Sequence, residues 1–198
     1  MKLLAICERI AITGDDGVET GEYGVSARVH PALIPVAHPL AAVHGANNAV
    51  FVQAEAAGSL MFYGAGAGGI ETASAVLGDL VSAARRHVIG GPGIAESTHA
   101  TVEVLPISSV RTRYQITLNV IDQPGVLATI ASLFSDHGVS VEAVSQSVSD
   151  GKSGSLPTAT LVIVTHEATE SSLAATVEAL AANPAVSQVV SVLRVEGL

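Results

Sequence analysis

The chain is poor in the residues that stabilise secreted proteins and in those that bind nucleic acids. Its single cysteine, Cys7, excludes an internal disulfide. It has no tryptophan, and aromatic residues make up 3% of the chain, so we expect an aliphatic core and no platform on which bases could stack. Nine Lys and Arg against 18 Asp and Glu give a formal charge of -9. That balance opposes binding to nucleic acid or to an anionic membrane.

No apolar run is long enough to cross a bilayer. The most apolar region, 31–52, is interrupted by prolines, histidines and asparagines, so no segment reaches the roughly 20 residues that a membrane helix needs. The apolar residues 3–7 end at Glu8-Arg9 and are too few for a signal peptide. We therefore expect a cytoplasmic protein with no membrane partner.

The residue types that carry catalysis or bind metals are scattered. The seven histidines lack the i, i+4 or clustered spacing of a metal site. Cys7 falls in an apolar strand-like segment, so we expect a buried, unreactive thiol. No serine-centred motif or carboxylate pair stands out. The sequence therefore predicts neither a metal site nor a catalytic residue.

The first 89 residues predict a partial antiparallel sheet with one long helix. Strand character is found at 3–12, 23–29, 49–55 and 59–63, and residues 14–17 mark the first turn. The helix runs from about residue 71 to residue 87, and its apolar side is formed by Ala73, Val76, Leu77, Leu80 and Ala84. Because one helix covers little of such a sheet, we expect association through the sheet, with another copy or with a preceding segment.

A glycine-dense segment, 64–69, directly precedes this helix. Backbone N–H groups at a helix start can hold an anion or a planar ligand. The segment lacks the complete strand, G-x-G-x-x-G and acidic residue of a dinucleotide fingerprint, so a crossover that requires close backbone packing is the alternative. Arg85, Arg86 and His87 fall in the last turn of the helix, where cations complement its dipole, and are not predicted to bind phosphate.

From Thr112 onward the pattern is βαββαβ. Strands are expected at 114–120, 139–148, 161–164 and 186–195, with a loop at 151–157. One helix includes 127–134 and stops at Gly138, and a second, with Leu173, Val177 and Leu180 on one face, stops at Asn183-Pro184. This order is typical of a ferredoxin-like α+β unit with two helices on one face of its sheet. A glycine-rich hinge at 90–93 divides the chain into 1–89, a linker at 90–111, and 112–198.

The run Asn119-Val120-Ile121-Asp122-Gln123-Pro124-Gly125-Val126-Leu127 joins the first strand of this unit to its first helix. Pro124 suits a first helical turn, Gly125 allows close backbone approach, and N–H groups at the helix start can hold a carboxylate. A plain strand-to-helix turn is the alternative.

In the βαββαβ context this run resembles the ligand loop of an ACT domain, a small regulatory sensor of amino acids. In ACT domains the strand-to-helix loop and the neighbouring strand of a partner copy commonly form the effector pocket. The resemblance therefore implies an effector site at Asn119, Asp122, Gly125, Val126 and Leu127, in which Asp122 meets the ammonium group. Gln146, on the second strand, is a further candidate, and a solvent-facing role is its alternative.

Further runs resemble homoserine dehydrogenase. They are Ser26-Ala27-Arg28-Val29-His30-Pro31, His38-Pro39-Leu40-Ala41, Asn48-Ala49-Val50-Phe51-Val52, and Met61-Phe62-Tyr63-Gly64-Ala65-Gly66-Ala67-Gly68-Gly69 followed by Thr72-Ala73-Ser74-Ala75-Val76. Members with this layout have a nucleotide-binding domain, a central substrate and dimerisation domain, and a C-terminal ACT domain. They interconvert aspartate semialdehyde and homoserine with NAD(P)H, and threonine commonly regulates them.

The resemblance implies that residues 1–89 are the end of the central domain and that Met1 is a truncation point. Gly64, Gly66 and Gly68 would lie beside the cofactor of the whole enzyme. The catalytic residues and the dinucleotide fingerprint would lie upstream, so the isolated chain is expected to bind NAD(P) poorly and to be inactive. Glu71 stands where the family often has proline, which brings negative charge toward the cofactor loop.

Two hypotheses follow. The chain is either the C-terminal portion of a homoserine dehydrogenase, with dimerisation and regulation by an amino acid such as L-threonine, or a free-standing, non-catalytic ACT module. Both imply a homo-oligomer, a dimer or larger, held through the sheet and the ACT domain. A role of the ACT unit in assembly alone, without an effector, is a third possibility.

Overall fold

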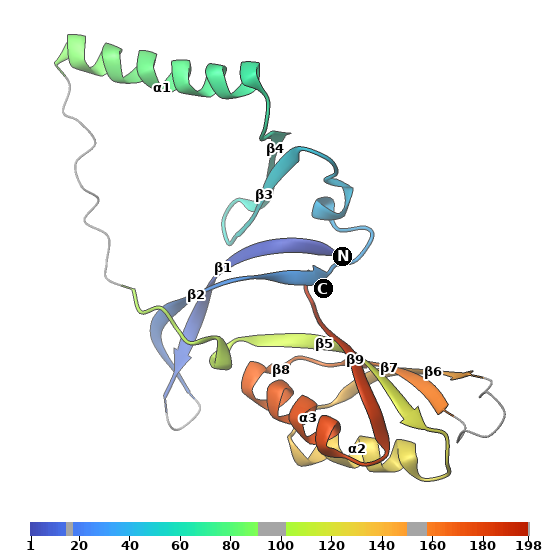
Figure 1. Ribbon diagram of the computed structural model, residues 1–198. Helices are drawn as coiled ribbons and strands as arrows, with labels where there is room; N and C mark the ends of the chain where they lie inside the picture. Colours follow the sequence, from blue (N-terminus) through green and yellow to red (C-terminus); the bar gives the residue numbers. More distant parts are fainter. Residues whose placement is uncertain (15–17, 91–101, 150–157, 198) are drawn as a thin grey trace. The chain divides into compact units, whose positions relative to one another are not determined.

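The computed structural model describes residues 1–14, 18–90, 102–149 and 158–197 (Figure 1). The chain forms two compact units, one made of Met1–Pro35 with Val102–Leu198 and the other of Val36–Thr101. The predicted turn at 14–17, hinge at 90–93 and loop at 151–157 lie largely outside the described residues. None of the described helices is both long and apolar enough to span a membrane.

The C-terminal part of the first unit has the predicted βαββαβ order. Its elements are β5 (Arg111–Ile121), α2 (Val126–Asp136), β6 (Val141–Ser149), β7 (Thr158–Thr165), α3 (Glu170–Ala182) and β9 (Val186–Val195). The strands lie in the order β9-β5-β7-β6, and each neighbouring pair is antiparallel. A two-residue strand that the sequence did not predict, β8 (Ala168–Thr169), pairs with the start of β5.

The core of this unit lies between the sheet and its two helices, which occupy one face of the sheet (Figure 1). Strands β5 and β7 alternate buried and partly exposed residues, because successive side chains of a strand point to opposite faces. The hydrophobic residues of the core are aliphatic except for Tyr114 and Phe134, as the composition predicts. The most deeply buried are Ile116, Leu118, Ile130, Phe134, Leu161, Ile163, Leu173 and Leu180.

Local sequence signals set the ends of both helices. Helix α2 stops at Asp136 because Gly138 adopts a φ of 67°, its N–H donates to the Ser135 carbonyl, and the Val139 N–H donates to the Phe134 carbonyl. These two bonds are the Schellman pattern of a glycine-terminated helix. The Thr169 hydroxyl caps α3 by accepting from the Ser172 N–H at 3.3 Å. Helix α3 ends before Asn183-Pro184, as predicted.

The four predicted N-terminal strands form two antiparallel pairs, and not the single sheet that the sequence predicts. Strands β1 (Lys2–Thr13) and β2 (Glu19–Leu33) form an antiparallel hairpin. Strand β2 extends further than expected, and its last residues pair in parallel with the end of β9, so the hairpin joins the sheet of the first unit. Cys7 is exposed on edge strand β1, so the prediction of a buried thiol is wrong.

The second unit contains the other two predicted strands and the long helix. Strands β3 (Asn47–Ala54) and β4 (Gly58–Ala65) pair antiparallel after a 3-10 turn at Pro39–Ala42. Helix α1 (Gly69–Ile89) follows, and none of its residues is buried. Val76, Leu77 and Leu80, on the predicted apolar side, are each more than half exposed. The helix therefore presents an apolar surface that no described residue covers.

We predict that Leu173→Ala lowers the free energy of unfolding of the first unit by about 2–5 kcal/mol, because it removes a fully buried side chain and leaves a cavity. Urea unfolding followed by circular dichroism measures the change. Val144→Ala, at a side chain that is 44% exposed, is the control and should cost less than about 1 kcal/mol. Equal costs for the two variants would contradict the packing described above.

Candidate functional site

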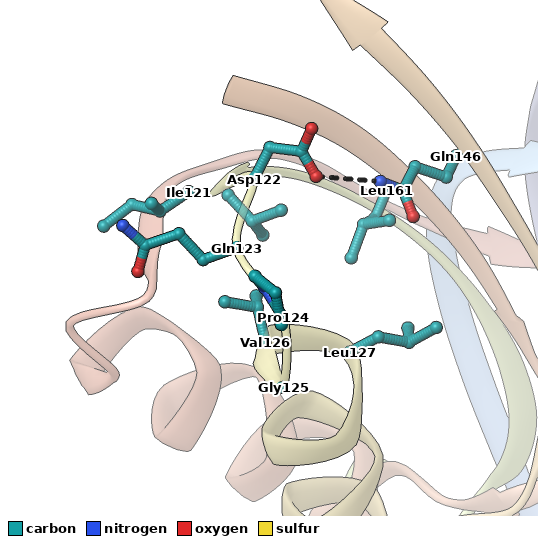
Figure 2. Close-up of a pocket in the computed structure, with 10 residues that line it drawn as sticks. Ile121, Asp122, Gln123, Pro124, Gly125, Val126, Leu127, Gln146 and Leu161 are labelled. Atoms are coloured by element: carbon teal, nitrogen blue, oxygen red, sulfur yellow. Dashed lines mark hydrogen bonds between the residues drawn. The ribbon is translucent and has the colours of Figure 1, made fainter. Parts of the chain in front are cut away.

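A pocket of about 440 Å³ opens where β5 passes into α2. It lies on the helix-covered side of the sheet, at the end of β5, and Figure 2 shows the loop, the first turn of α2 and two neighbouring strand residues around it. Its lining residues are Val120, Ile121, Asp122, Gln123, Pro124, Gly125, Val126, Leu127, Gln146 and Leu161. The run that the sequence singles out as a ligand loop therefore forms most of a real concavity.

Gly125 determines how the chain enters α2. Its φ of 92° lies in the left-handed region that glycine adopts without steric cost, and no side chain caps the helix after it. The helix begins at Val126, two residues later than Pro124, so Pro124 belongs to the preceding turn and not to the first helical turn. An uncapped helix start leaves backbone N–H groups of the first turn available to a ligand, and the partial positive charge there favours an anion.

Asp122 and Gln146 form the polar side of the pocket. The Gln146 Nε2 donates to the Asp122 Oδ1 at 3.4 Å (Figure 2). The Gln146 side chain is exposed, and Asp122 is partly exposed. The pairing register brings them together, because Gln146 of β6 stands opposite Leu161 of β7, on the face that also carries the helices. Gln146 therefore lines the pocket while its side chain is exposed to solvent.

Asn119 is the one predicted effector residue that does not line the pocket. Its neighbours Leu118 and Val120 are buried on the helix side, so alternation along β5 turns Asn119 to the opposite face of the sheet. There its Oδ1 accepts a hydrogen bond from the Thr160 Oγ1 at 3.0 Å. The structure thus brings together Asp122, Gly125, Val126, Leu127 and Gln146 and leaves Asn119 out.

Val120 and Leu161 form an apolar wall of the pocket that the sequence did not predict. Leu161 forms part of the floor, although its side chain belongs to the buried row of β7, and Val120 closes the β5 side. The cross-strand partner of Gln146 could have identified Leu161, but strand register is not visible in the sequence. These side chains give the pocket an apolar surface beside its one carboxylate.

This arrangement is complementary to a small zwitterion. The Asp122 carboxylate can accept hydrogen bonds from an ammonium group, and N–H groups at the start of α2 can donate to a carboxylate. The apolar wall leaves room for a short side chain. Asp122 and the helix start lie on one loop, so a free amino acid could contact both through its two charged ends.

The glycine loop at 64–68 is a weaker candidate for a ligand site. A side chain at Gly66 would occupy the space held by the Asn48 amide, and Gly68 has a φ of 143° with the Glu71 carboxylate against it. Gly66 and Gly68 thus have local structural reasons to be glycine, whereas a side chain at Gly64 would meet nothing. Since the charged side chain at this helix start is a carboxylate, these residues alone do not fit the phosphates of a dinucleotide.

Comparisons with known proteins agree with both halves of this description. The family profile of homoserine dehydrogenase matches residues 1–81, and that of the ACT domain matches residues 114–185. The chain is 52% identical over 197 residues to homoserine dehydrogenase from Mycobacterium tuberculosis strain H37Rv, an alignment that covers 100% of the chain and 43% of that relative. The chain belongs to the homoserine dehydrogenase family. Both resemblances that the sequence predicts are confirmed.

Other members of the homoserine dehydrogenase family match over a similar extent. The enzyme from Corynebacterium glutamicum is 50% identical over 196 residues, covering 99% of the chain and 41% of that relative. The crystal structure of homoserine dehydrogenase from Thiobacillus denitrificans superposes with a TM-score of 0.77 at 35% identity, covering 90% of this chain and 40% of that one. The chain thus spans less than half the length of these relatives, which are oxidoreductases by name.

We predict that Gly125→Ala and Gly138→Ala each lower the free energy of unfolding by about 1–2 kcal/mol. Both glycines have positive φ, and an added Cβ meets no atom within 4 Å at either, so the cost is conformational and not steric. Chemical denaturation measures it. The two variants form a matched pair, because Gly125 lines the pocket and Gly138 closes the other end of the same helix. A negligible cost at both positions would contradict the backbone geometry.

Proposed function

We propose that the chain is the C-terminal, regulatory portion of a homoserine dehydrogenase and that its ACT domain binds an amino acid effector. The observation that carries the proposal is the pocket that both Asp122 and the uncapped start of α2 line, within the segment that matches the ACT profile. The pocket offers groups of opposite polarity, as an amino acid zwitterion requires.

The activity of the whole enzyme is part of the proposal. It would interconvert L-aspartate semialdehyde and L-homoserine by hydride transfer with NAD(P), in the cytoplasm, on the route to threonine and methionine. The chain alone is proposed to be inactive, because it spans about 43% of its relatives and its glycine loop does not fit a dinucleotide by itself. In the whole enzyme Gly64, Gly66 and Gly68 would complete a cofactor site whose other residues lie elsewhere.

The effector is proposed to be L-threonine. Its short side chain suits the space between Leu161 and the first turn of α2, and its two charged groups suit Asp122 and the helix start. Assembly into a dimer or larger oligomer is proposed to use the sheets and the ACT domain. Edge strand β1 supports this, because Leu3 is 72% exposed there and an unpaired strand edge favours pairing with another chain.

A free-standing ACT module is the second candidate function. It is favoured by the position of the pocket, whose lining residues all fall between Val120 and Leu161, inside the ACT match. Such a module could bind an amino acid without any catalytic part. The two candidates differ in whether the coding frame continues upstream into a nucleotide-binding domain.

We predict that millimolar L-threonine raises the thermal unfolding midpoint of the 198-residue chain. A ligand that binds only the folded state stabilises it by mass action, by about 2.7 kcal/mol at a concentration of 100 times its Kd. Differential scanning fluorimetry with an extrinsic dye measures the shift, with L-isoleucine and L-homoserine as controls. Equal shifts with all three amino acids would remove the assignment of threonine, and no shift with any of them would remove the effector site.

Asp122→Asn is predicted to weaken threonine binding by roughly 10- to 100-fold, because it removes the charge that meets the ammonium group while keeping the size of the side chain. Stability should change by less than about 1 kcal/mol, since Asp122 is only partly buried and Asn can still accept the hydrogen bond from Gln146. Isothermal titration calorimetry measures the affinity. Asp136→Asn, at the exposed far end of α2, is the matched control and should bind threonine as the parent chain does. Unchanged affinity in Asp122→Asn would refute the role of Asp122.

A further inference from the structure

The hairpin β1–β2 is attached to the ACT sheet by a very short backbone contact. Strands β2 and β9 pair in parallel at Ala32 with Arg194 and at Leu33 with Val195. The Glu196 N–H then donates to the Leu33 carbonyl at 2.9 Å. Parallel pairing is slightly less stable per residue than antiparallel pairing, and two registered pairs make a weak joint. The Val25 N–H of β2 also donates to the Glu103 carbonyl at 2.8 Å, and the Leu105 N–H donates to the Val25 carbonyl at 2.9 Å, so backbone bonds hold β2 to the segment before β5 as well. At the ACT sheet itself, side chains supplement the two-pair contact.

One carboxylate spans this joint. Glu196, directly after β9, has both oxygens 3.5 Å from the Arg28 Nη2 of β2. One of its oxygens also lies 3.6 Å from the His30 Nε2 of β2 and accepts from the Thr112 Oγ1 of β5 at 3.5 Å. The Glu196 side chain is 16% exposed, against 5% for Arg28 and 7% for His30. The Glu196 carboxylate thus contacts side chains of both β2 and β5 in a largely buried position.

Glu196 is the more buried of the two carboxylates that compensate the charge of Arg28. Among the described residues, the buried Arg28 Nε and His30 Nε2 have no hydrogen-bond partner. Arg28 also donates to the Ser26 hydroxyl and to Glu8, each at 2.9 Å, but Glu8 belongs to β1 and its side chain is 48% exposed. Removing one partner of a buried ion pair is strongly destabilising, because it leaves the other charge uncompensated.

The charged series continues into the ACT core. Arg194, two residues before Glu196, is paired with Glu170 at the start of α3, and the Tyr114 hydroxyl donates to Glu170 at 2.6 Å. Burial and the Glu170 carboxylate raise the pKa of Tyr114 well above its usual value. Burial alone would lower the pKa of Arg194, but Glu170 and, less strongly, Glu196 raise it overall. Cations and anions therefore alternate from β2 to α3.

We propose that Glu196 is the positioning residue through which the ACT domain holds the hairpin β1–β2. This hairpin belongs to residues 1–81, the part of the chain that matches homoserine dehydrogenase. Strand β5 connects the pocket with the contact at Glu196. Val120 and Ile121 at one end of β5 line the pocket, and Thr112 at the other end contacts Glu196. Effector binding tightens β5 and, through Glu196, the joint with β2. This transmission rests on the proposed function. Glu196 itself lies outside both family matches, which end at residues 81 and 185.

Hydrogen exchange of the 198-residue chain, read by mass spectrometry with and without saturating L-threonine, tests the proposal. Without ligand, Glu196→Gln should speed exchange at the Glu196 amide and in the adjoining end of β9 by about tenfold or more, while α2 and α3 stay protected. Glu8→Gln is the matched control, because it removes the other carboxylate from Arg28 without touching β9. It should leave exchange at the joint within about twofold of the parent chain.

The measurements with threonine distinguish two roles of Glu196: transmitting the effect of ligand binding to β2, and supporting the structure of the joint. In the parent chain, threonine should slow exchange both at 120–128 and in the Ala32–Leu33 part of β2. In Glu196→Gln it should still slow exchange at 120–128, with unchanged threonine affinity, but no longer in β2. Glu196→Asp, which keeps the charge, should restore part of the β2 response.

Three outcomes would overturn the proposal. Glu8→Gln could loosen the joint as much as Glu196→Gln does, or the β2 response could persist in Glu196→Gln, and either would remove the special role of Glu196. Threonine protection confined to 120–128 in the parent chain would overturn transmission and leave the effector site standing. Absence of protection at 120–128 would instead count against the proposed function, and the ligand-free comparison would then decide the role of Glu196 at the joint.

Discussion

The burial of alternate side chains along β5 is the constraint on which the first unit depends. Its even-numbered residues from Thr112 to Val120 are all buried on the side that carries the helices. That alternation places Val120 at the pocket, Ile116 and Leu118 in the core, and Thr112 at the joint with β2. A shift of one residue in the register would expose the core and turn Asn119 into the pocket.

The pocket lies at one end of β5, and the contact with β2 lies at the other end. At one end, Gly125 enters the left-handed region and α2 begins without a side-chain cap, which leaves a site for an anion beside the Asp122 carboxylate. At the other end, Arg28 and His30 of β2 and the Thr112 hydroxyl of β5 surround Glu196. The proposed ligand site and the contact with β2 thus lie on one continuous strand. This arrangement is what a regulatory domain requires, because an effector must influence residues that it does not touch.

The ACT part could be predicted well from the sequence because its signals are local. The alternation in β5, the helical spacing of Leu127, Ile130 and Phe134, and the glycine after α2 each act over a few residues, and each element was found where expected within a few positions. The ACT resemblance of the loop after β5 could be recognised for the same reason. The very short strand β8 was missed because two residues carry no periodic pattern.

What could not be predicted depends on pairing between distant segments. The parallel contact of Ala32 with Arg194 joins residues far apart in the chain, and no local pattern specifies it. Hence the four N-terminal strands were expected in one sheet, whereas two of them extend the ACT sheet. The buried position of Arg28 and the exposure of Cys7 follow from that pairing. Asn119 was misplaced because a loop motif does not state which face a strand residue occupies.

Chemical-shift mapping of the 15N-labelled chain during a titration with L-threonine tests the central claim most directly, since it reports where an amino acid binds. The account predicts the largest amide shifts at Leu127 and Ala128, at the start of α2, with smaller shifts at Asp122 and Gln146. Shifts centred on another surface, or no change in any of these amides at saturating threonine, would contradict the assignment of the pocket.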